Sequence, residues 1–315
     1  MKNLSVVVPC YNEEAALPLF YNEITAVAER LASVRFEFVF IDDGSTDGTL
    51  ALLREYRKRD DRVRFLSFSR NFGKEAGLLA GLRAARGDYV TVMDADLQDP
   101  PELLLQMYDG IVTEGYDCVA ARRVSRAGEP PLRSMFAGLF YRLMRRISKV
   151  EMVDGARDFR LMTRKVADAI ISMPESNRFS KGIFGWVGFK TKWVPYEHAP
   201  RSRGETKWSI WSLFKYSIDG IVAFSQVPLA ISSLAGIVMF LVSLVMIVFI
   251  IVRKLLFGDP VSGWASLACI IIFMGSVQLF CTGIMGQYIS KMYLEVKGRP
   301  LYFVRETDED TDEGE

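Results

Sequence analysis

The chain has 315 residues and a formal net charge of +1, a length sufficient for one large hydrophobic core or two modest ones. Its single histidine, His198, argues against a histidine base or a multi-histidine metal site, and its four cysteines form no C-x-x-C pair. Seven acidic residues lie in the last ten positions, and without them the chain carries 39 basic against 31 acidic residues, a net charge of +8. We therefore expect a basic body that suits nucleotide phosphates or an anionic membrane surface, and a solvated, disordered acidic tail.

Short β-rich runs alternate with helix-like stretches in the first part of the chain. The expected strands are residues 4–9, 36–42, 63–69, 88–94 and 116–121, and the expected helices are about 13–32, 47–59, 74–86 and 101–113. Strands separated by helices of this length predict right-handed βαβ units and a mostly parallel α/β sheet.

A polar cluster follows each of the first four strands. The clusters are "PCYNEE" (9–14), "IDDGSTDG" (41–48), "SRNFGKEAG" (69–77) and "DADLQD" (94–99). Because ligands bind at the carboxyl ends of parallel strands, these clusters predict a single site at one edge of the sheet. Taken separately, each also fits a plain structural role: a helix start, a capped turn, or a polar loop after a strand.

The pair Asp94 and Asp96 is the strongest indication of a ligand at this edge. A hard divalent cation prefers one or two carboxylates together with phosphate oxygens and water. Both side chains can meet such an ion if the strand breaks into a turn between them, so a nucleoside diphosphate with its cation fits the clusters. The chain lacks G-x-G-x-x-G and G-x-x-x-x-G-K-[ST] sequences, which argues against a Rossmann dehydrogenase or a P-loop ATPase.

Two long uncharged stretches near the C-terminus predict a membrane hairpin. Residues 229–252 and 264–290 contain no charged residue, and each is long enough to span a hydrocarbon core of about 30 Å. Eight basic residues lie in the two flanks against two in the connector. Positive flanks stay in the cytosol, so we expect an integral protein of the plasma (inner) membrane whose first two hundred residues are cytosolic.

These patterns divide the chain into four segments. We expect a cytosolic catalytic domain over 1–205, an interfacial amphipathic helix over 206–226, two transmembrane helices within 227–290, and a cytosolic segment with the acidic tail over 291–315. Gly275, Gly283 and Gly286 in the second span would let helices approach closely, so we also expect a homo-oligomer.

Seven motifs in this order resemble one family over about residues 4–305. They are "VVVPCYNEE", "IDDGSTDGT", "RNFGKEAGLLAGL", "DADLQDPPE", "DFRLM", "RSRGETKW" and "EVKGRPLY". As a set they resemble the polyprenyl-phosphate glycosyltransferases of the inverting GT-A group (glycosyltransferase family 2). The likeness is greater to the bactoprenol glucosyltransferases than to dolichyl-phosphate mannose synthase. The resemblance implies a GT-A catalytic domain, Rossmann-like with a mostly parallel sheet, and a two-helix membrane anchor.

The resemblance also implies the reaction and its partners. A sugar, expected to be glucose from UDP-glucose, passes with inversion to polyprenyl (bactoprenyl) phosphate on the cytosolic face. The implied partners are this donor, the lipid acceptor and membrane lipids, with no nucleic acid. UDP-aminoarabinose, UDP-GlcNAc or GDP-mannose are alternative donors. A processive polysaccharide synthase or a non-catalytic scaffold are further alternatives, although the Q-x-x-R-W motif of the synthases is missing.

Residue roles on the donor side follow from the same resemblance. Asp94, Asp96 and Gln98 would hold Mg²⁺ or Mn²⁺ against the donor diphosphate, where the ion offsets charge on the departing UDP. The implied nucleotide-sugar site is made of Pro9, Tyr11, Glu13, Asp42, Asp43, Lys74 and Asp94.

On the acceptor side, the expected catalytic residues are Asp158 and Asp96. A carboxylate in "GARDFRLM" is the family's proposed base, with Asp158 the first candidate and Asp154 the second. The acceptor is a phosphate monoester, whose second pKa is near 6, so it scarcely needs deprotonating. We therefore expect Asp158 mainly to orient the acceptor. The lipid phosphate would bind three basic residues, Arg201, Arg203 and Lys207.

Overall fold

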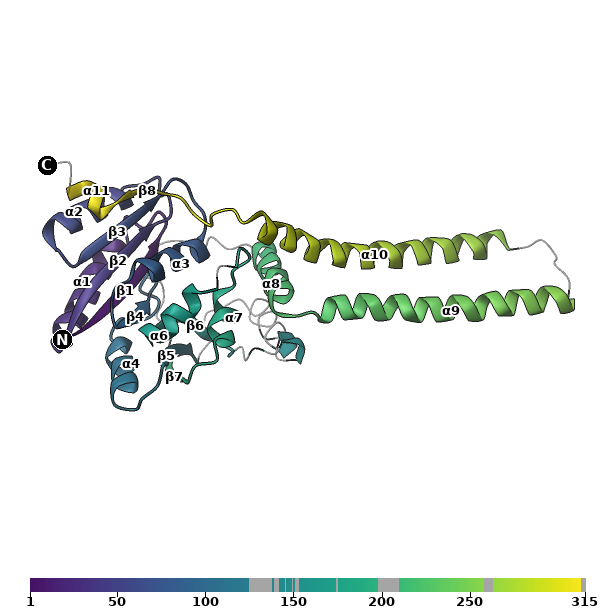
Figure 1. The fold of residues 1–315 in the computed structure, drawn as a ribbon, viewed down its shortest axis with the longest axis horizontal. Coiled ribbons are helices and arrows are strands. Elements are labelled where there is room, and N and C mark those ends of the chain that lie inside the picture. The colour runs from purple at the N-terminus through teal and green to yellow at the C-terminus, as the bar shows by residue number, and fades with distance from the viewer. Residues whose placement is uncertain are drawn as a thin grey trace.

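The computed structural model of the protein describes residues 1–124, 138, 142–144, 146–148, 150, 153–173, 175–197, 210–257 and 263–312. The first two hundred residues contribute a layered α/β unit, from which two long helices extend side by side (Figure 1).

A mixed sheet of eight strands, in the order β7-β5-β6-β4-β1-β2-β3-β8, organises the described part of the chain. The strands are β1 (Lys2–Cys10), β2 (Val34–Asp42), β3 (Val63–Phe68), β4 (Tyr89–Val92), β5 (Cys118–Arg123), β6 (Ala156–Thr163), β7 (Thr191–Tyr196) and β8 (Val304–Thr307). The helices are α1 (Leu17–Arg30), α2 (Thr49–Arg59), α3 (Lys74–Ala84), α4 (Leu103–Val112), α6 (Arg164–Ile171), α7 (Ser180–Trp186), α8 (Ile210–Phe224), α9 (Val227–Phe257), α10 (Trp264–Lys297) and α11 (Asp308–Asp312).

The expected parallel sheet is confirmed at the centre. β1 pairs in parallel with β2 and β4, and β2 pairs in parallel with β3. The sequence did not predict β6, β7 or β8. β6 lies antiparallel between β4 and β5, β7 is parallel to β5, and β8 is antiparallel to β3. The carboxyl ends of β4, β1, β2 and β3 therefore lie next to one another at one edge.

Successive side chains of β1 enter two hydrophobic cores, one on each face of the sheet. Val6 and Val8 pack with residues of α1, α2 and α4, whereas Val7 packs with residues of α3, α6 and α7. This follows from the alternation of side chains along a strand. A fully buried Val, Leu, Ile or Phe side chain contributes roughly 1.5–3 kcal/mol, so the apolar runs that predicted the strands also hold both helix layers in place.

Helices α9 and α10 are apolar and uncovered. Both are long and apolar enough to cross a membrane, and the most apolar stretch of each helix has no buried residue. A core helix of a soluble protein would be covered, and these helices are far from the N-terminus, where a signal sequence would lie. They agree with the two spans expected at 229–252 and 264–290.

The C-terminal segment differs from the expected disordered tail. After α10 the chain returns to the sheet, where β8 pairs with β3 and α11 follows at the edge (Figure 1). Glu306 forms a bidentate pair with Arg54, at 2.6 and 2.8 Å, and Asp308 is buried beside Arg64. Basic side chains of the body thus neutralise part of the acidic run. Residues 313–315 lie outside the described residues.

Two glycines of α3 give a test of how closely this helix packs on the sheet. A Cβ at Gly81 would lie 2.2 Å from Val7 Cγ1, whereas a Cβ at Gly77 would lie 3.4 Å from Pro9 Cβ. We expect Gly81→Ala to destabilise the protein by about 1–3 kcal/mol through overpacking. The matched change Gly77→Ala should be neutral or stabilise it by up to about 1 kcal/mol, because alanine favours helix. Thermal unfolding in detergent measures both, and equal midpoints would contradict the packing argument.

Candidate active site

The chain turns sharply directly after β4, as the aspartate pair requires. Leu97 adopts a left-handed conformation, with φ of 56°, and the backbone N–H of Gln98 donates to Asp96 Oδ1 at 3.1 Å. The turn places Asp94 and Asp96 at the carboxyl edge of the sheet. No group of three His, Cys, Asp or Glu side chains suited to a metal occurs within the described ranges.

Lys74 brings two of the expected carboxylates together. Its Nζ lies 2.7 Å from Asp94 Oδ1 and 2.8 Å from Asp158 Oδ2. Lys74 is the first residue of α3, Asp94 follows β4, and Asp158 lies on β6, the neighbour of β4 in the sheet. A residue from the third polar cluster and one from the fourth therefore meet the "DFRLM" motif at one point.

In this cluster, neighbouring charges and burial shift the pKa values of Asp158 and Lys74 in opposite directions. Burial alone would raise the pKa of Asp158, but Lys74 and Lys181 outweigh it and hold this pKa far below its ordinary value. Burial would likewise lower the pKa of Lys74, but Asp158 and Asp94 raise it above its ordinary value. The Lys74 ammonium lies between the two carboxylates, although 42% of the Lys74 side chain remains exposed to solvent. Asp158 therefore stays ionised at neutral pH.

The loops after β1 and β2 form one hydrogen-bonded wall. Asn12, in a left-handed conformation with φ of 54°, accepts a hydrogen bond from the backbone N–H of Thr46 at 2.8 Å. The N–H of Glu13 donates to Thr49 Oγ1 at 2.9 Å. Tyr11 is exposed on this wall and Pro9 is half-buried. Four of the residues expected to line the nucleoside pocket, Pro9, Tyr11, Glu13 and Asp42, thus lie at the ends of adjacent strands.

Asp42 is fully buried at the end of β2. Its Oδ2 accepts a hydrogen bond from Ser67 Oγ at 2.7 Å, and its Oδ1 accepts one from the N–H of Ser45 at 3.0 Å. The Ser67 contact holds the carboxylate against β3, and the Ser45 contact ties it to the loop after β2, so its orientation depends on both.

Asp43, expected in the nucleotide-sugar site, bonds to the loop before α3. It is buried, and its two carboxylate oxygens accept hydrogen bonds from the backbone N–H groups of Phe72 and Gly73 at 2.6 and 2.9 Å. Burial raises the pKa of Asp43, against the effect of these two bonds. Because α3 begins at the next residue, these two bonds hold the loop that places Lys74.

An arginine that the sequence did not single out holds the turn after β4. Arg157 Nε lies 3.0 Å from Asp99 Oδ1, and its Nη2 donates to the Gln98 side-chain oxygen at 3.3 Å. Tyr196 donates a hydrogen bond to the same Asp99. The expected metal ligand Gln98 therefore has its amide oxygen directed at Arg157. The one feature of the sequence that could have drawn attention to Arg157 is its position directly before Asp158.

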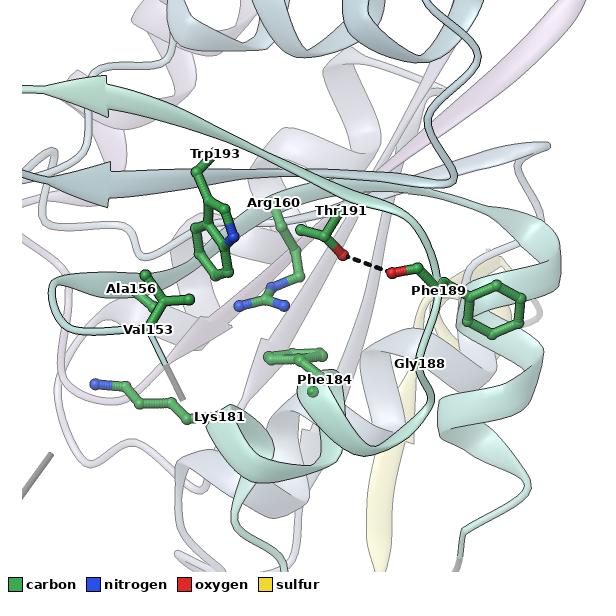
Figure 2. A pocket seen from close by; sticks show the side chains of 10 residues that line it. Val153, Ala156, Arg160, Lys181, Phe184, Gly188, Phe189, Thr191 and Trp193 are labelled. Atoms are coloured by element: carbon green, nitrogen blue, oxygen red, sulfur yellow. Dashed lines mark hydrogen bonds between the residues drawn. The ribbon is translucent and has the colours of Figure 1, made fainter. Parts of the chain in front are cut away.

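A cavity of about 250 Å³ lies beside Asp158, between β6, β7 and α7. Figure 2 shows the guanidinium of Arg160 within it, below Trp193 and above Phe184, with Lys181 at the side. The Arg160 guanidinium stacks 3.5 Å from the centre of the Phe184 ring and donates to the backbone oxygens of Asp158 and Arg157. Burial lowers the pKa of Arg160. The cavity thus combines aromatic walls with two cations.

The remaining expected residues either precede β6 or are not among the described residues. Asp154, the second candidate base, lies in the turn before β6, where its backbone oxygen accepts a hydrogen bond from Arg122. Arg201, Arg203 and Lys207, expected to bind the lipid phosphate, lie outside the described residues, as does His198.

Known proteins are similar to this chain over nearly its full length. A family model described as Glycosyl transferase family 2 matches residues 5–171. A prophage bactoprenol glucosyl transferase homolog of Escherichia coli (strain K12) is 40% identical over 96% of this chain and 98% of its own. The bactoprenol glucosyl transferase of Shigella phage SfII is 40% identical over the same shares. An uncharacterized glycosyltransferase of Synechocystis sp. is 41% identical over 96% of this chain and 94% of its own.

Solved structures align over a smaller part. Glucosyl-3-phosphoglycerate synthase of Mycobacterium tuberculosis, crystallised with Mn²⁺, UDP and phosphoglyceric acid, aligns with a TM-score of 0.47 at 23% identity, covering 70% of this chain and 76% of that one. The family match covers more than half of the chain and includes β1 to β4 with their polar clusters. The chain therefore belongs to glycosyl transferase family 2 and is a glycosyltransferase with the mixed, mostly parallel sheet of the GT-A fold.

Proposed function

We propose that the chain transfers glucose, with inversion, from UDP-glucose to polyprenyl phosphate at the cytosolic face of a membrane. The observation that carries the proposal is the meeting of Asp94 and Asp158 at Lys74, in a chain that ends in two apolar, uncovered helices. Relatives named bactoprenol glucosyl transferase, 40% identical over nearly the whole chain, support this substrate pair.

The donor nucleotide would bind at the carboxyl edge of β1 and β2. Tyr11 offers an exposed aromatic ring for stacking on the base, and Pro9 offers an apolar surface beside it. Glu13 supplies a carboxylate of the kind that accepts base N–H groups or ribose hydroxyls, and the buried Asp42 supports the site by holding the loop after β2 through the N–H of Ser45. Asp43 contributes indirectly, through the loop that places Lys74.

A divalent cation, Mg²⁺ or Mn²⁺, would be held by Asp94 and Asp96. The donor set fits a hard cation, because two carboxylates lie on one turn and a nucleoside diphosphate would supply the remaining oxygens. When bound, the ion offsets the charge that develops on the departing UDP. Gln98 would support the turn through Arg157.

Asp158 would orient the acceptor and would not act as a strong base. Its pKa is held far below the ordinary value by neighbouring cations, so its carboxylate has little affinity for a proton. The acceptor needs little help, because a phosphate monoester is largely dianionic at neutral pH. An ionised Asp158 instead fixes the ammonium of Lys74, which can bind a phosphate oxygen as a point charge.

The acceptor phosphate would approach from the cavity beside Asp158. Arg160 and Lys181 line this cavity and supply positive charge there. Arg201, Arg203 and Lys207 would add to that charge near the point where the chain enters the membrane. A guanidinium binds phosphate in a bidentate way, and an ammonium binds it as a point charge.

The proposed topology follows from the charge flanking the hairpin. The two segments that flank the hairpin carry eight basic residues, and the connector between the spans carries two. This asymmetry favours a cytosolic catalytic domain over 1–205, an interfacial helix over 206–226 and spans within 227–290. Gly275, Gly283 and Gly286 have open space where a Cβ would lie. A second copy of the chain could pack closely against these three glycines.

Purified full-length protein incubated with polyprenyl phosphate and a panel of UDP- and GDP-sugars tests the reaction. We expect a product with the mass of glucosyl-phosphoryl-polyprenol from UDP-glucose, lost with EDTA and restored by Mn²⁺ or Mg²⁺. Asp96→Asn should lower kcat by about 100-fold or more, since a cation contributes several kcal/mol of charge stabilisation. Product from another sugar alone would contradict the donor assignment, and full activity in EDTA would contradict the metal.

Asp158 and Arg203 should affect different kinetic constants. Asp158→Asn is expected to lower kcat by about 100-fold with little change in the donor KM, because it acts on the reacting geometry. Arg203→Ala is expected to raise the acceptor KM by about tenfold, the effect of one charge-assisted hydrogen bond, at an unchanged donor KM. Steady-state assays with each substrate varied in turn give both constants. Near-normal turnover of Asp158→Asn at every pH would refute its role.

Removing Lys74 should destabilise the protein more than removing Asp158. Lys74→Met leaves two carboxylates facing each other without their cation, whereas Asp158→Asn leaves Lys74 paired with Asp94. We expect Lys74→Met to cost about 1–2 kcal/mol, less than a fully buried pair because the lysine is partly exposed. Thermal unfolding without nucleotide measures the order. The reverse order would show that Lys74 does not hold the two carboxylates together.

A further inference from the structure

The segment that follows the membrane hairpin packs against the nucleotide side of the sheet. Residues 299–312, the C-terminal strap, run from the end of α10 along β3 and include β8 and α11 (Figure 1). This strap includes the second half of the "EVKGRPLY" motif, residues 299–302, to which the proposed reaction assigns no task.

Two aromatic residues fix the start of the strap. Tyr302 stacks on Phe68 at the end of β3, with ring centres 4.9 Å apart and planes 16° apart. Phe303 packs against Phe72, and its backbone oxygen accepts a hydrogen bond from the N–H of Ser69 at 3.0 Å. Phe72 belongs to the loop that Asp43 holds in front of Lys74. The strap therefore contacts the backbone that carries the third polar cluster.

Arg305 extends this contact to the buried carboxylate of Asp42, at the end of β2. Its Nη2 donates a hydrogen bond to Ser67 Oγ at 3.0 Å, and Ser67 Oγ donates to Asp42 Oδ2 at 2.7 Å. Ser67 and Asp42 are both fully buried and lie opposite each other in the β2–β3 register. Because the serine hydroxyl has one proton, the bond from Arg305 directs that proton towards Asp42.

We propose that Arg305 is a positioning residue for the donor site, which orients Asp42 through Ser67 and makes nucleotide binding depend on the return of the chain from the membrane hairpin. The inference rests on the proposed role of Asp42 in supporting the nucleoside site. From the antiparallel edge strand β8, Arg305 places a guanidinium on the hydroxyl that bonds to the buried carboxylate. A hydrogen-bonded charge of this kind contributes more than a neutral pair, and its loss leaves the acceptor group less well held.

The decisive measurement is UDP binding, in the presence of Mn²⁺, to the full-length protein in detergent by calorimetry. We expect Arg305→Met to weaken UDP binding by about five- to tenfold, the effect of one lost charge-assisted hydrogen bond. Arg305→Lys should recover most of the affinity. In steady-state assays Arg305→Met should raise the donor KM by a similar factor and leave the acceptor KM and kcat within about twofold, a split that general loss of structure would not produce.

Arg86→Met is the matched control. Arg86 also pairs with the strap, through Glu309 at 3.4 Å, but that pair is exposed and lies apart from the Ser67 and Asp42 contact. We expect its UDP affinity to equal that of the unchanged protein. Ser67→Ala removes the intermediate hydroxyl and should weaken UDP binding as Arg305→Met does. The double variant should be no weaker than either single one, because both changes break the same path.

The outcomes separate this inference from the proposed function. UDP affinity that is unchanged in Arg305→Met and Ser67→Ala, beside a weakened Asp42→Asn, would overturn the role of Arg305 alone. Unchanged affinity in Asp42→Asn would remove the donor role of Asp42 and the inference with it. If Arg305→Met does not fold, Ser67→Ala decides, since it removes only one oxygen atom from the core.

Discussion

The ion contact of Lys74 with Asp94 and Asp158 is the constraint on which the site depends. It joins the start of α3, the turn after β4 and the first part of β6, three segments that are distant in the sequence. Like charges at this edge would repel one another without the lysine between them. The position of Lys74 depends in turn on Asp43, whose carboxylate holds the loop in front of α3. The edge is therefore a set of coupled contacts, in which each carboxylate has a structural partner before any ligand binds.

The parallel half of the fold was predictable, and the antiparallel half was not. β1 to β4 are apolar runs that end in polar clusters, so local pattern and chain order suffice to place them side by side. β6 is inserted between β4 and β5 by long-range pairing that no local pattern records. The disordered tail was expected from composition alone. Composition misses that Arg54 and Arg64 of the body neutralise Glu306 and Asp308.

The site residues also divide into those that local pattern predicts and those that depend on long-range contacts. The strand pattern placed Asp94 at the sheet edge, the family resemblance singled out Asp158, and the structure brings both to Lys74. Adjacent residues of one motif, however, have opposite surroundings: Asp42 bonds to β3, whereas Asp43 turns to the loop before α3. Such a division depends on the direction of each side chain at a strand end, which the sequence does not specify. Arg157 was missed for a related reason, because its partner Asp99 lies in another segment.

The course of the chain joins the apolar hairpin of α9 and α10 to the proposed donor site. The catalytic part enters the hairpin through α8 on the side of β6 and α7, and it leaves through the strap, which returns to β3 at the opposite end of the sheet (Figure 1). Two attachments restrain a domain more than one, because rotation about a single linker is then blocked. A lipid phosphate at the membrane surface and a nucleotide at the β1–β2 edge would thus meet at a fixed geometry. This would favour transfer by pre-organised orientation of the two substrates. The acidic residues of the tail contribute to this restraint. Glu306 and Asp308 pair with Arg54 and Arg64, and these ion pairs hold the strap against the sheet.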